Sequence, residues 1–105
     1  MLVLPIKKKW FDMIVSGEKT EEYREIKPYY DSRFKKYMPR PTTFRKEYIA
    51  AQFIIIFRNG YNSKSPFIKC KCIVDTGKGK EKWGAIPGKR YYVLKILEIM
   101  EVNNG

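Results

Sequence analysis

Charged side chains are concentrated in residues 17–24, which read GEKTEEYR. If this segment is extended from Lys19 onward, Thr20, Glu22 and Arg24 share one face, because side chains alternate along a strand. Glu22 could accept a hydrogen bond from the amino group of a base, and Arg24 could clamp a phosphate or carboxylate with its planar guanidinium. Lys19 could supply a point charge, or act as a base if burial lowers its pKa. The spacing predicts either a small recognition site or a surface ladder of salt bridges, which contribute little to stability.

Two elements before this segment must position it. Residues 2–6 are an apolar run that predicts a first strand, and residues 7–16 have helical spacing, with Trp10, Met13 and Ile14 on one face. Gly17 follows directly, and glycine is the usual residue where a helix ends with a positive φ. Residues 19–26 then predict a strand that begins immediately after the helix. The charged segment should therefore lie beside the first helix.

The rest of the chain predicts a sheet. Residues 52–58 (QFIIIFR), 66–74 and 90–102 predict strands by their β-branched or alternating apolar content. Residues 29–37 favour a short helix, and Gly77, Gly79 and residues 83–88 predict loops. Residues 27–52 otherwise give no clear pattern, since Pro28, Pro39 and Pro41 interrupt any long element. The sum is an α+β fold, a small antiparallel or mixed β-barrel of about five to six strands with one or two N-terminal helices.

Length and charge narrow the class of protein. The 105 residues are enough for a single domain, 1–105, with one modest core. The formal net charge of +11 attracts polyanions, and nucleic acid is the commonest of these, although surface lysines can also serve solubility alone. No predicted helix has one basic and one apolar face, so we expect no membrane partner. Histidine is absent, which excludes Ser-His and Cys-His catalysis and the commonest metal ligand.

The two cysteines indicate a structural role. Cys70 and Cys72 are two residues apart, so on one strand their side chains are too far apart for an unstrained disulfide. Buried free thiols on a strand face are the simplest interpretation, and we expect neither a metal nor a cofactor. Free thiols, the lack of a signal-peptide pattern and the shortness of the longest apolar run, residues 53–57, predict a cytoplasmic protein.

Further candidates for contact with a polyanion lie outside the charged segment. Lys9, in the run Lys7 to Lys9 at the helix start, could meet a phosphate, and Arg58 and Tyr61 flank an Asn-Gly turn. Trp83 lies in a glycine- and proline-rich loop, where stacking on a base and packing are equally expected. Residues 33–46 contain six basic and no acidic residues, with aromatic residues between them. They predict a basic surface patch.

The segment PIKKKWFDMIVSGEKTEEYREI resembles the start of an ASCH domain, a family named for homology to a transcriptional coactivator. The signature of that family is Gly-x-Lys-x-x-Glu-x-Arg just after a first helix, and Gly17, Lys19, Glu22 and Arg24 match all four positions. The closing pattern WGAIPGKRYYVLKI is also similar. The resemblance covers residues 2–26 well and 83–99 moderately, and it does not extend to residues 27–52.

The resemblance implies a β-barrel similar to the PUA RNA-binding domain, with a cleft between barrel and first helix that is lined by Lys19, Glu22 and Arg24. Family members are thought to bind RNA, and some are amidohydrolases that act on acetylated cytidine, while ribonuclease activity has been ascribed to others. The amidohydrolases have a catalytic Thr where this chain has Glu22, and Thr20 lies two residues earlier on the same strand face.

This departure favours recognition over hydrolysis. If the protein is an enzyme, Lys19 and Glu22 are the expected catalytic residues, and no further carboxylate stands out, although Asp75 and Glu81 are available. Three hypotheses remain open at this point: an RNA- or nucleotide-binding module, a hydrolase of a modified nucleoside or of RNA, and a module that binds an acidic protein.

Overall fold

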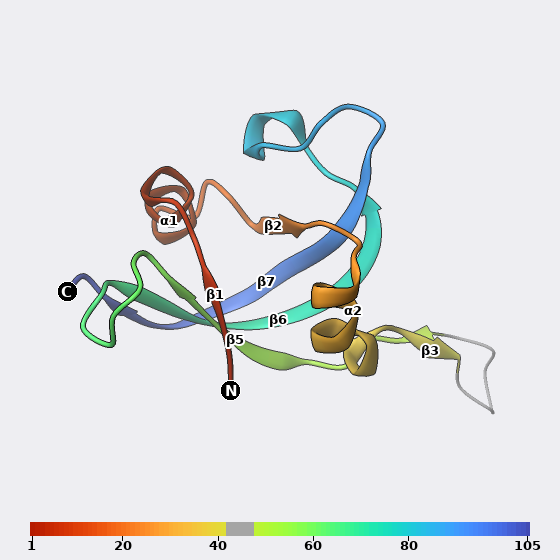
Figure 1. Ribbon diagram of the computed structural model, residues 1–105, viewed down its shortest axis with the longest axis horizontal. Coiled ribbons are helices and arrows are strands. Elements are labelled where there is room, and N and C mark those ends of the chain that lie inside the picture. The colour runs from red at the N-terminus through yellow and green to blue at the C-terminus, as the bar shows by residue number, and fades with distance from the viewer. Residues whose placement is uncertain (42–47) are drawn as a thin grey trace.

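Five strands form one mixed sheet that curls into a half-barrel in the computed structural model, which describes residues 1–41 and 48–105 (Figure 1). The strand order is β1-β5-β6-β7-β2, with β1 and β5 parallel and the other neighbours antiparallel. Their bounds are β1 Leu2–Pro5, β2 Glu21–Arg24, β5 Phe53–Arg58, β6 Phe67–Lys78 and β7 Arg90–Asn103. The two-residue strands β3 (Arg40–Pro41) and β4 (Tyr48–Ile49) pair separately.

Two α-helices flank the sheet. Helix α1 (Lys8–Val15) buries Phe11 and Ile14, and the chain leaves it through Gly17, whose φ of +84° is easily adopted only by glycine. Helix α2 (Pro28–Phe34) begins at a proline, whose fixed φ suits the first helical turn. The 3₁₀ turn η1 (Lys35–Tyr37) continues α2, and a second such turn, η2 (Glu81–Trp83), lies between β6 and β7.

The core lies on the concave face of the sheet. Burial alternates strictly along β5 and along residues 67–74 of β6, and Ile55 is opposite Cys70 in the register. Phe34 of α2 is fully buried against this face, where its ring meets the Tyr92 ring edge-on at 5.2 Å between centroids. The hydroxyl of Tyr92 donates to Asp31 at 2.5 Å, which fixes α2 over the sheet.

The curl of the sheet brings its two edge strands together. The long β6–β7 ladder has register shifts at Lys69/Cys70 and at Lys71/Cys72, and such irregularities bend and twist a strand. Although β1 and β2 lie at opposite edges, Arg24 of β2 donates from Nη2 to the carbonyl oxygen of Pro5 in β1 at 2.7 Å. A side chain, rather than a backbone ladder, therefore connects the two edges.

Most elements expected from the sequence are confirmed. The predicted α+β class and the N-terminal strand, helix and strand are present, as are the buried, free Cys70 and Cys72. The short helix expected over residues 29–37 is also present, as α2, from Pro28 to Phe34. The predicted loop at Gly77 is wrong, because β6 continues to Lys78 in register with Arg90 of β7. Within the described parts of the chain, no helix is long and apolar enough to cross a membrane.

Candidate functional site

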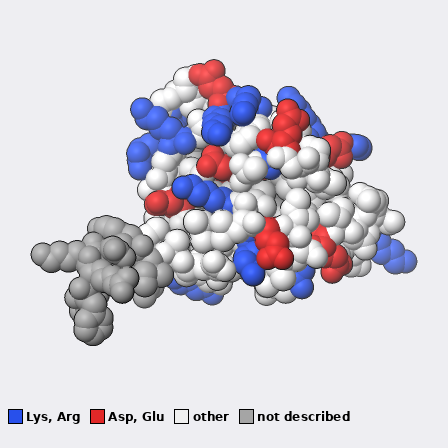
Figure 2. Space-filling model, turned by 180° about the vertical axis from the view of Figure 1, so that it is seen from behind, with Lys and Arg blue, Asp and Glu red and all other residues white. Residues whose placement is uncertain are grey.

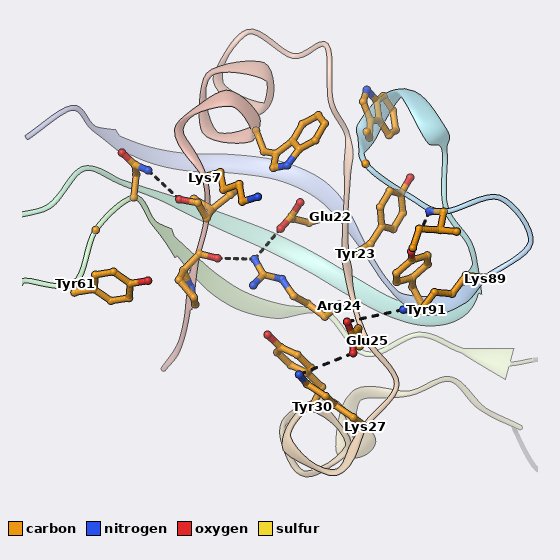
Figure 3. A pocket seen from close by; sticks show the side chains of 18 residues that line it. Lys7, Glu22, Tyr23, Arg24, Glu25, Lys27, Tyr30, Tyr61, Lys89 and Tyr91 are labelled. Atoms are coloured by element: carbon orange, nitrogen blue, oxygen red, sulfur yellow. Dashed lines mark hydrogen bonds and ion pairs between the residues drawn. The ribbon is translucent and has the colours of Figure 1, made fainter.

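A cleft of about 820 Å³ opens where the two sheet edges approach each other, between β1, α1, β2 and the segment that follows η2 (Figure 3). Its charged lining consists of four basic residues and two glutamates: Lys7, Arg24, Lys27, Lys89, Glu22 and Glu25. The cleft is also lined by six aromatic residues, as many as the charged ones: Trp10, Tyr23, Tyr30, Tyr61, Trp83 and Tyr91. The volume is in the range of ligand pockets, and the lining carries more charged groups than is usual for a site that binds an apolar ligand.

Three side chains of the GEKTEEYR segment meet at the base of this cleft: Glu22 and Arg24 line it, and Lys19 lies beneath them. Lys19 donates from Nζ to Glu22 Oε1 at 2.8 Å, and Arg24 donates from Nη2 to Glu22 Oε2 at 2.7 Å. Glu22 thus uses one oxygen for each cation. The predicted shared face of Glu22 and Arg24 is confirmed, and the alternative of an exposed ladder of salt bridges is wrong for these residues, since Lys19 and Glu22 are buried.

Lys19 lies beneath the cleft and is not part of its lining. Its side chain is inaccessible to solvent, and Nζ also donates to the carbonyl oxygen of Glu21. The rings of Trp10 and Tyr23 have their centroids 5.5 and 5.4 Å from Nζ. Burial lowers the pKa of the Lys19 ammonium below its ordinary value of 10.5, and the Glu22 carboxylate opposes this shift. Lys19 therefore acts on the cleft through Glu22.

Arg24 contributes the excess positive charge. Lys19, Glu22 and Arg24 together hold two cations and one anion, so the cluster has a net charge of +1. The Arg24 side chain is 11 % exposed, and its Nε is buried without a hydrogen-bond partner among the described residues. A buried donor without a partner is costly, so this N–H reduces the net stabilisation that the cluster gives to the fold.

The wall opposite β1 is built from the β6–β7 connection. The hydroxyl of Tyr23 accepts the backbone N–H of Lys80 at 2.9 Å, and the hydroxyl of Tyr91 accepts that of Ile86 at 3.0 Å. The backbone at Gly84 lies against the Trp10 ring, where a Cβ would be 2.9 Å from the nearest ring atom. Tyr23 therefore attaches this connection to β2, Tyr91 attaches it to the start of β7, and the Gly84 contact attaches it to α1.

This glycine contact gives a first testable expectation. Gly84→Ala should lower the free energy of unfolding by about 2–4 kcal/mol, because a side chain at φ +96° is strained and its Cβ would press on Trp10. Gly88→Ala is the matched control: its φ is +78°, with nothing within 4 Å of the added Cβ. Gly88→Ala should lower the free energy of unfolding by only about 1–2 kcal/mol. If urea denaturation shows that both variants lose the same free energy of unfolding, the β6–β7 connection does not pack closely on α1.

Basic side chains also gather on the β6–β7 connection. Residues 78–90 hold five exposed basic residues, Lys78, Lys80, Lys82, Lys89 and Arg90, and a single acidic residue, Glu81. Figure 2 shows lysine and arginine side chains concentrated over the part of the molecule that holds η2, with acidic side chains between them. Lys80 and Lys82 place their ammonium groups 4.6 and 4.8 Å from the Trp83 ring centroid.

The other predicted contact residues lie at different distances from the cleft. Trp83 lines it but is only 4 % exposed, so it is packed, and its Nε1 is buried without a partner in the described part of the chain. Lys9 is exposed beside the Trp10 ring, and Lys7 rather than Lys9 lines the cleft. Arg58 donates to the carbonyl oxygens of Ser63 and Ser65 at 3.1 Å each and lines a neighbouring cavity.

The predicted basic patch, residues 33–46, is described in part. Residues 42–47 of the segment 33–46 lie outside the described residues. Within the described part, Arg33 stacks on the Tyr29 ring, with its guanidinium carbon 3.5 Å from the centroid, and donates to the Tyr29 carbonyl oxygen. Neither residue lines the cleft.

The aromatic lining was largely missed by sequence reasoning. Tyr23 and Tyr91 were visible only as strand residues, and Trp10 was expected in the core, where it also packs. Tyr30 follows the Pro28 start of α2, a signal that could have placed it near the end of β2. Three of the six aromatic residues, Tyr61, Trp83 and Tyr91, come from segments distant in sequence from GEKTEEYR, so only the fold brings them to the cleft.

Comparison with known proteins assigns no family to the chain. No protein-family model, no curated protein and no solved structure matches it. In the described ranges, no group of three or more cysteine, aspartate and glutamate side chains is arranged to hold a metal ion. The cleft itself must therefore support any functional proposal.

Proposed function

We propose that this protein is an RNA- or nucleotide-binding domain of the ASCH type, with a PUA-like barrel and with the cleft at Glu22 and Arg24 as its binding site. The resemblance of residues 17–24 to the family signature motivates the name. The half-barrel and the helix directly before the motif are compatible with it.

One observation carries the proposal: a buried cluster with a net charge of +1 lies under a cleft with aromatic walls. Arg24 lines the cleft, and its guanidinium can bind a phosphate or a base carbonyl oxygen. Trp10, Tyr23 and Tyr91 supply apolar surface for a base. Lys7, Lys27 and Lys89, also on the lining, provide phosphate contacts.

The geometry favours binding over hydrolysis. Lys19 Nζ is inaccessible and already donates to Glu22 Oε1 and to a backbone carbonyl oxygen. Each Glu22 oxygen already accepts a hydrogen bond from a cation, so the carboxylate is engaged in the two ion pairs. Burial raises the pKa of the Tyr23 phenol, which therefore stays protonated near neutral pH. No observation on the cleft specifically favours a hydrolytic step.

The proposal is tested by measuring the affinity for labelled single-stranded RNA at increasing potassium chloride. The logarithm of the association constant should fall linearly with the logarithm of the salt concentration. The slope of this plot should be about −0.7 for each phosphate contacted. If varied single-stranded and structured RNAs, and free nucleotides, all fail to bind at low salt, the proposal is wrong.

Two further measurements separate the alternative functions. A pull-down treated with nuclease should lose its bound material, whereas a bound acidic protein would survive the treatment. Acetylated nucleosides and labelled RNA should be recovered unchanged after incubation, whereas product formation would favour the hydrolase.

A further inference from the structure

Tyr61 is the most exposed large aromatic side chain in the described parts of the chain, at 98 % exposure. It lies in the turn between β5 and β6. It borders the main cleft and also a second cavity of about 400 Å³, and Pro5 and Gly60 are likewise shared by both linings. Figure 3 shows Tyr61 at one end of the cleft and Lys89 at the other, with Lys7, Glu22 and Arg24 between them.

The turn that presents Tyr61 is firmly braced. Arg58 Nη1 donates to the carbonyl oxygens of Asn62, Ser63 and Ser65 at 3.1–3.4 Å. The Asn62 side chain accepts from the backbone N–H of Lys64 at 2.8 Å.

The turn is also tied to the start of α1. Asn59 Nδ2 donates to the carbonyl oxygen of Ile6 at 2.9 Å, and its backbone N–H donates to the carbonyl oxygen of Pro66 at 2.8 Å. The backbone of this turn is already ordered, and a tyrosine side chain has only two χ angles to fix, so stacking a flat partner on Tyr61 costs little conformational entropy.

We propose that Tyr61 is a stacking platform for a second base, and that the ligand is a single-stranded polynucleotide whose consecutive bases occupy the main cleft and the Tyr61 site. This inference rests on the proposed function and adds the class of ligand. Lys7 lines the cleft between the two positions and is exposed, so it can contact the linking phosphate.

Charge and stacking both favour this occupant. A chain with a net charge of +11 attracts a polyanion, and the cluster at Arg24 presents positive charge to the cleft. The bases of a duplex are stacked on each other, whereas those of a single strand are free to stack on aromatic side chains. Asn62 and Ser63, which line the second cavity, offer polar groups beside such a base.

The test compares ribonucleoside monophosphates with single-stranded oligoribonucleotides of about ten nucleotides, on the whole chain. Tyr61→Ala should weaken oligonucleotide binding roughly five- to a hundredfold, the loss expected for one stacked base, and should weaken mononucleotide binding much less, because Tyr61 only borders the main cleft. Tyr61→Phe should bind like the wild type because it keeps the ring. Lys64→Ala, in the same turn, should change the affinity less than threefold, by about one weak contact.

The outcomes distinguish this inference from the proposed function. Equal effects of Tyr61→Ala on both ligands, or no effect on the oligonucleotide, would overturn the stacking role. If the wild type binds mononucleotides as tightly as oligonucleotides, the proposed function stands and the polynucleotide inference falls. If it binds neither, both are wrong.

Discussion

Glu22→Gln should lower the free energy of unfolding by about 3–5 kcal/mol, a large part of the stability of a domain this size. The substitution leaves the inaccessible Lys19 ammonium without its counter-ion, and the Arg24 guanidinium nearby adds repulsion. An uncompensated buried charge is among the most destabilising changes in a protein. Urea denaturation followed by circular dichroism measures the effect.

An exposed ion pair in the same protein supplies the matched control. Glu98 pairs with Lys71 at 3.3 Å, but both side chains are well exposed. Glu98→Gln should therefore cost less than about 1 kcal/mol. Adding Lys19→Met to Glu22→Gln should restore much of the lost stability, since it removes the unpaired charge. If Glu22→Gln lowers the free energy of unfolding no more than Glu98→Gln does, Lys19, Glu22 and Arg24 do not form a buried ion-pair cluster.

The loss of stability caused by Glu22→Gln should also depend on pH. The pKa of Lys19 is already below 10.5 in the fold, and removing the Glu22 carboxylate removes the opposing effect that raises it. The unfolded variant then binds more protons than the folded one, so its stability rises with pH in the window below 10.5. The difference from the wild type should shrink as the pH approaches 10.5.

Replacing Lys7, Lys27 and Lys89 together by Gln should weaken RNA binding by about a hundredfold near ~0.1 M salt. The three ammonium groups lie on the cleft lining, and each lost phosphate contact should reduce the log–log salt slope by about 0.7. Fluorescence anisotropy with labelled single-stranded RNA at several salt concentrations gives both quantities.

The matched control removes the same charge elsewhere. Lys69, Lys78 and Lys95 lie on β6 and β7 and do not line the cleft. Their triple Gln variant should retain most of the affinity and the salt slope, apart from a small long-range effect. If both triple variants weaken binding equally, the interaction depends on net charge and the cleft is not the binding site.

The elements around GEKTEEYR could be predicted because their signals are local. The apolar run of β1, the helical spacing of α1 and Gly17 at the helix end place β2 beside α1 without any knowledge of the remaining fold. The alternation along β2 also predicts that Glu22 and Arg24 lie on one face, and their 2.7 Å ion pair follows from it.

The remaining features depend on contacts between distant segments. Lys19 is inaccessible because the rings of Trp10 and Tyr23 cover its ammonium group. No sequence pattern shows that these two rings come together over the Lys19 side chain. The Arg24 hydrogen bond to Pro5 joins opposite sheet edges, which requires the curl that the β6–β7 irregularities introduce. Trp83 is buried in a loop that contacts α1 at Gly84, whereas glycine and proline content alone left packing and stacking on a base equally expected.

The most direct test of RNA binding in the cleft uses the two tryptophans, because Trp10 and Trp83 are the only ones in the chain and both line it. Their indole N–H signals can be followed by NMR while single-stranded RNA is added. The account predicts that both signals shift in a saturable way, and that the shifts are lost at high salt. If RNA binds while both indole signals stay in place, and only amides of residues 97–103 move, the binding site is elsewhere and the central claim is wrong.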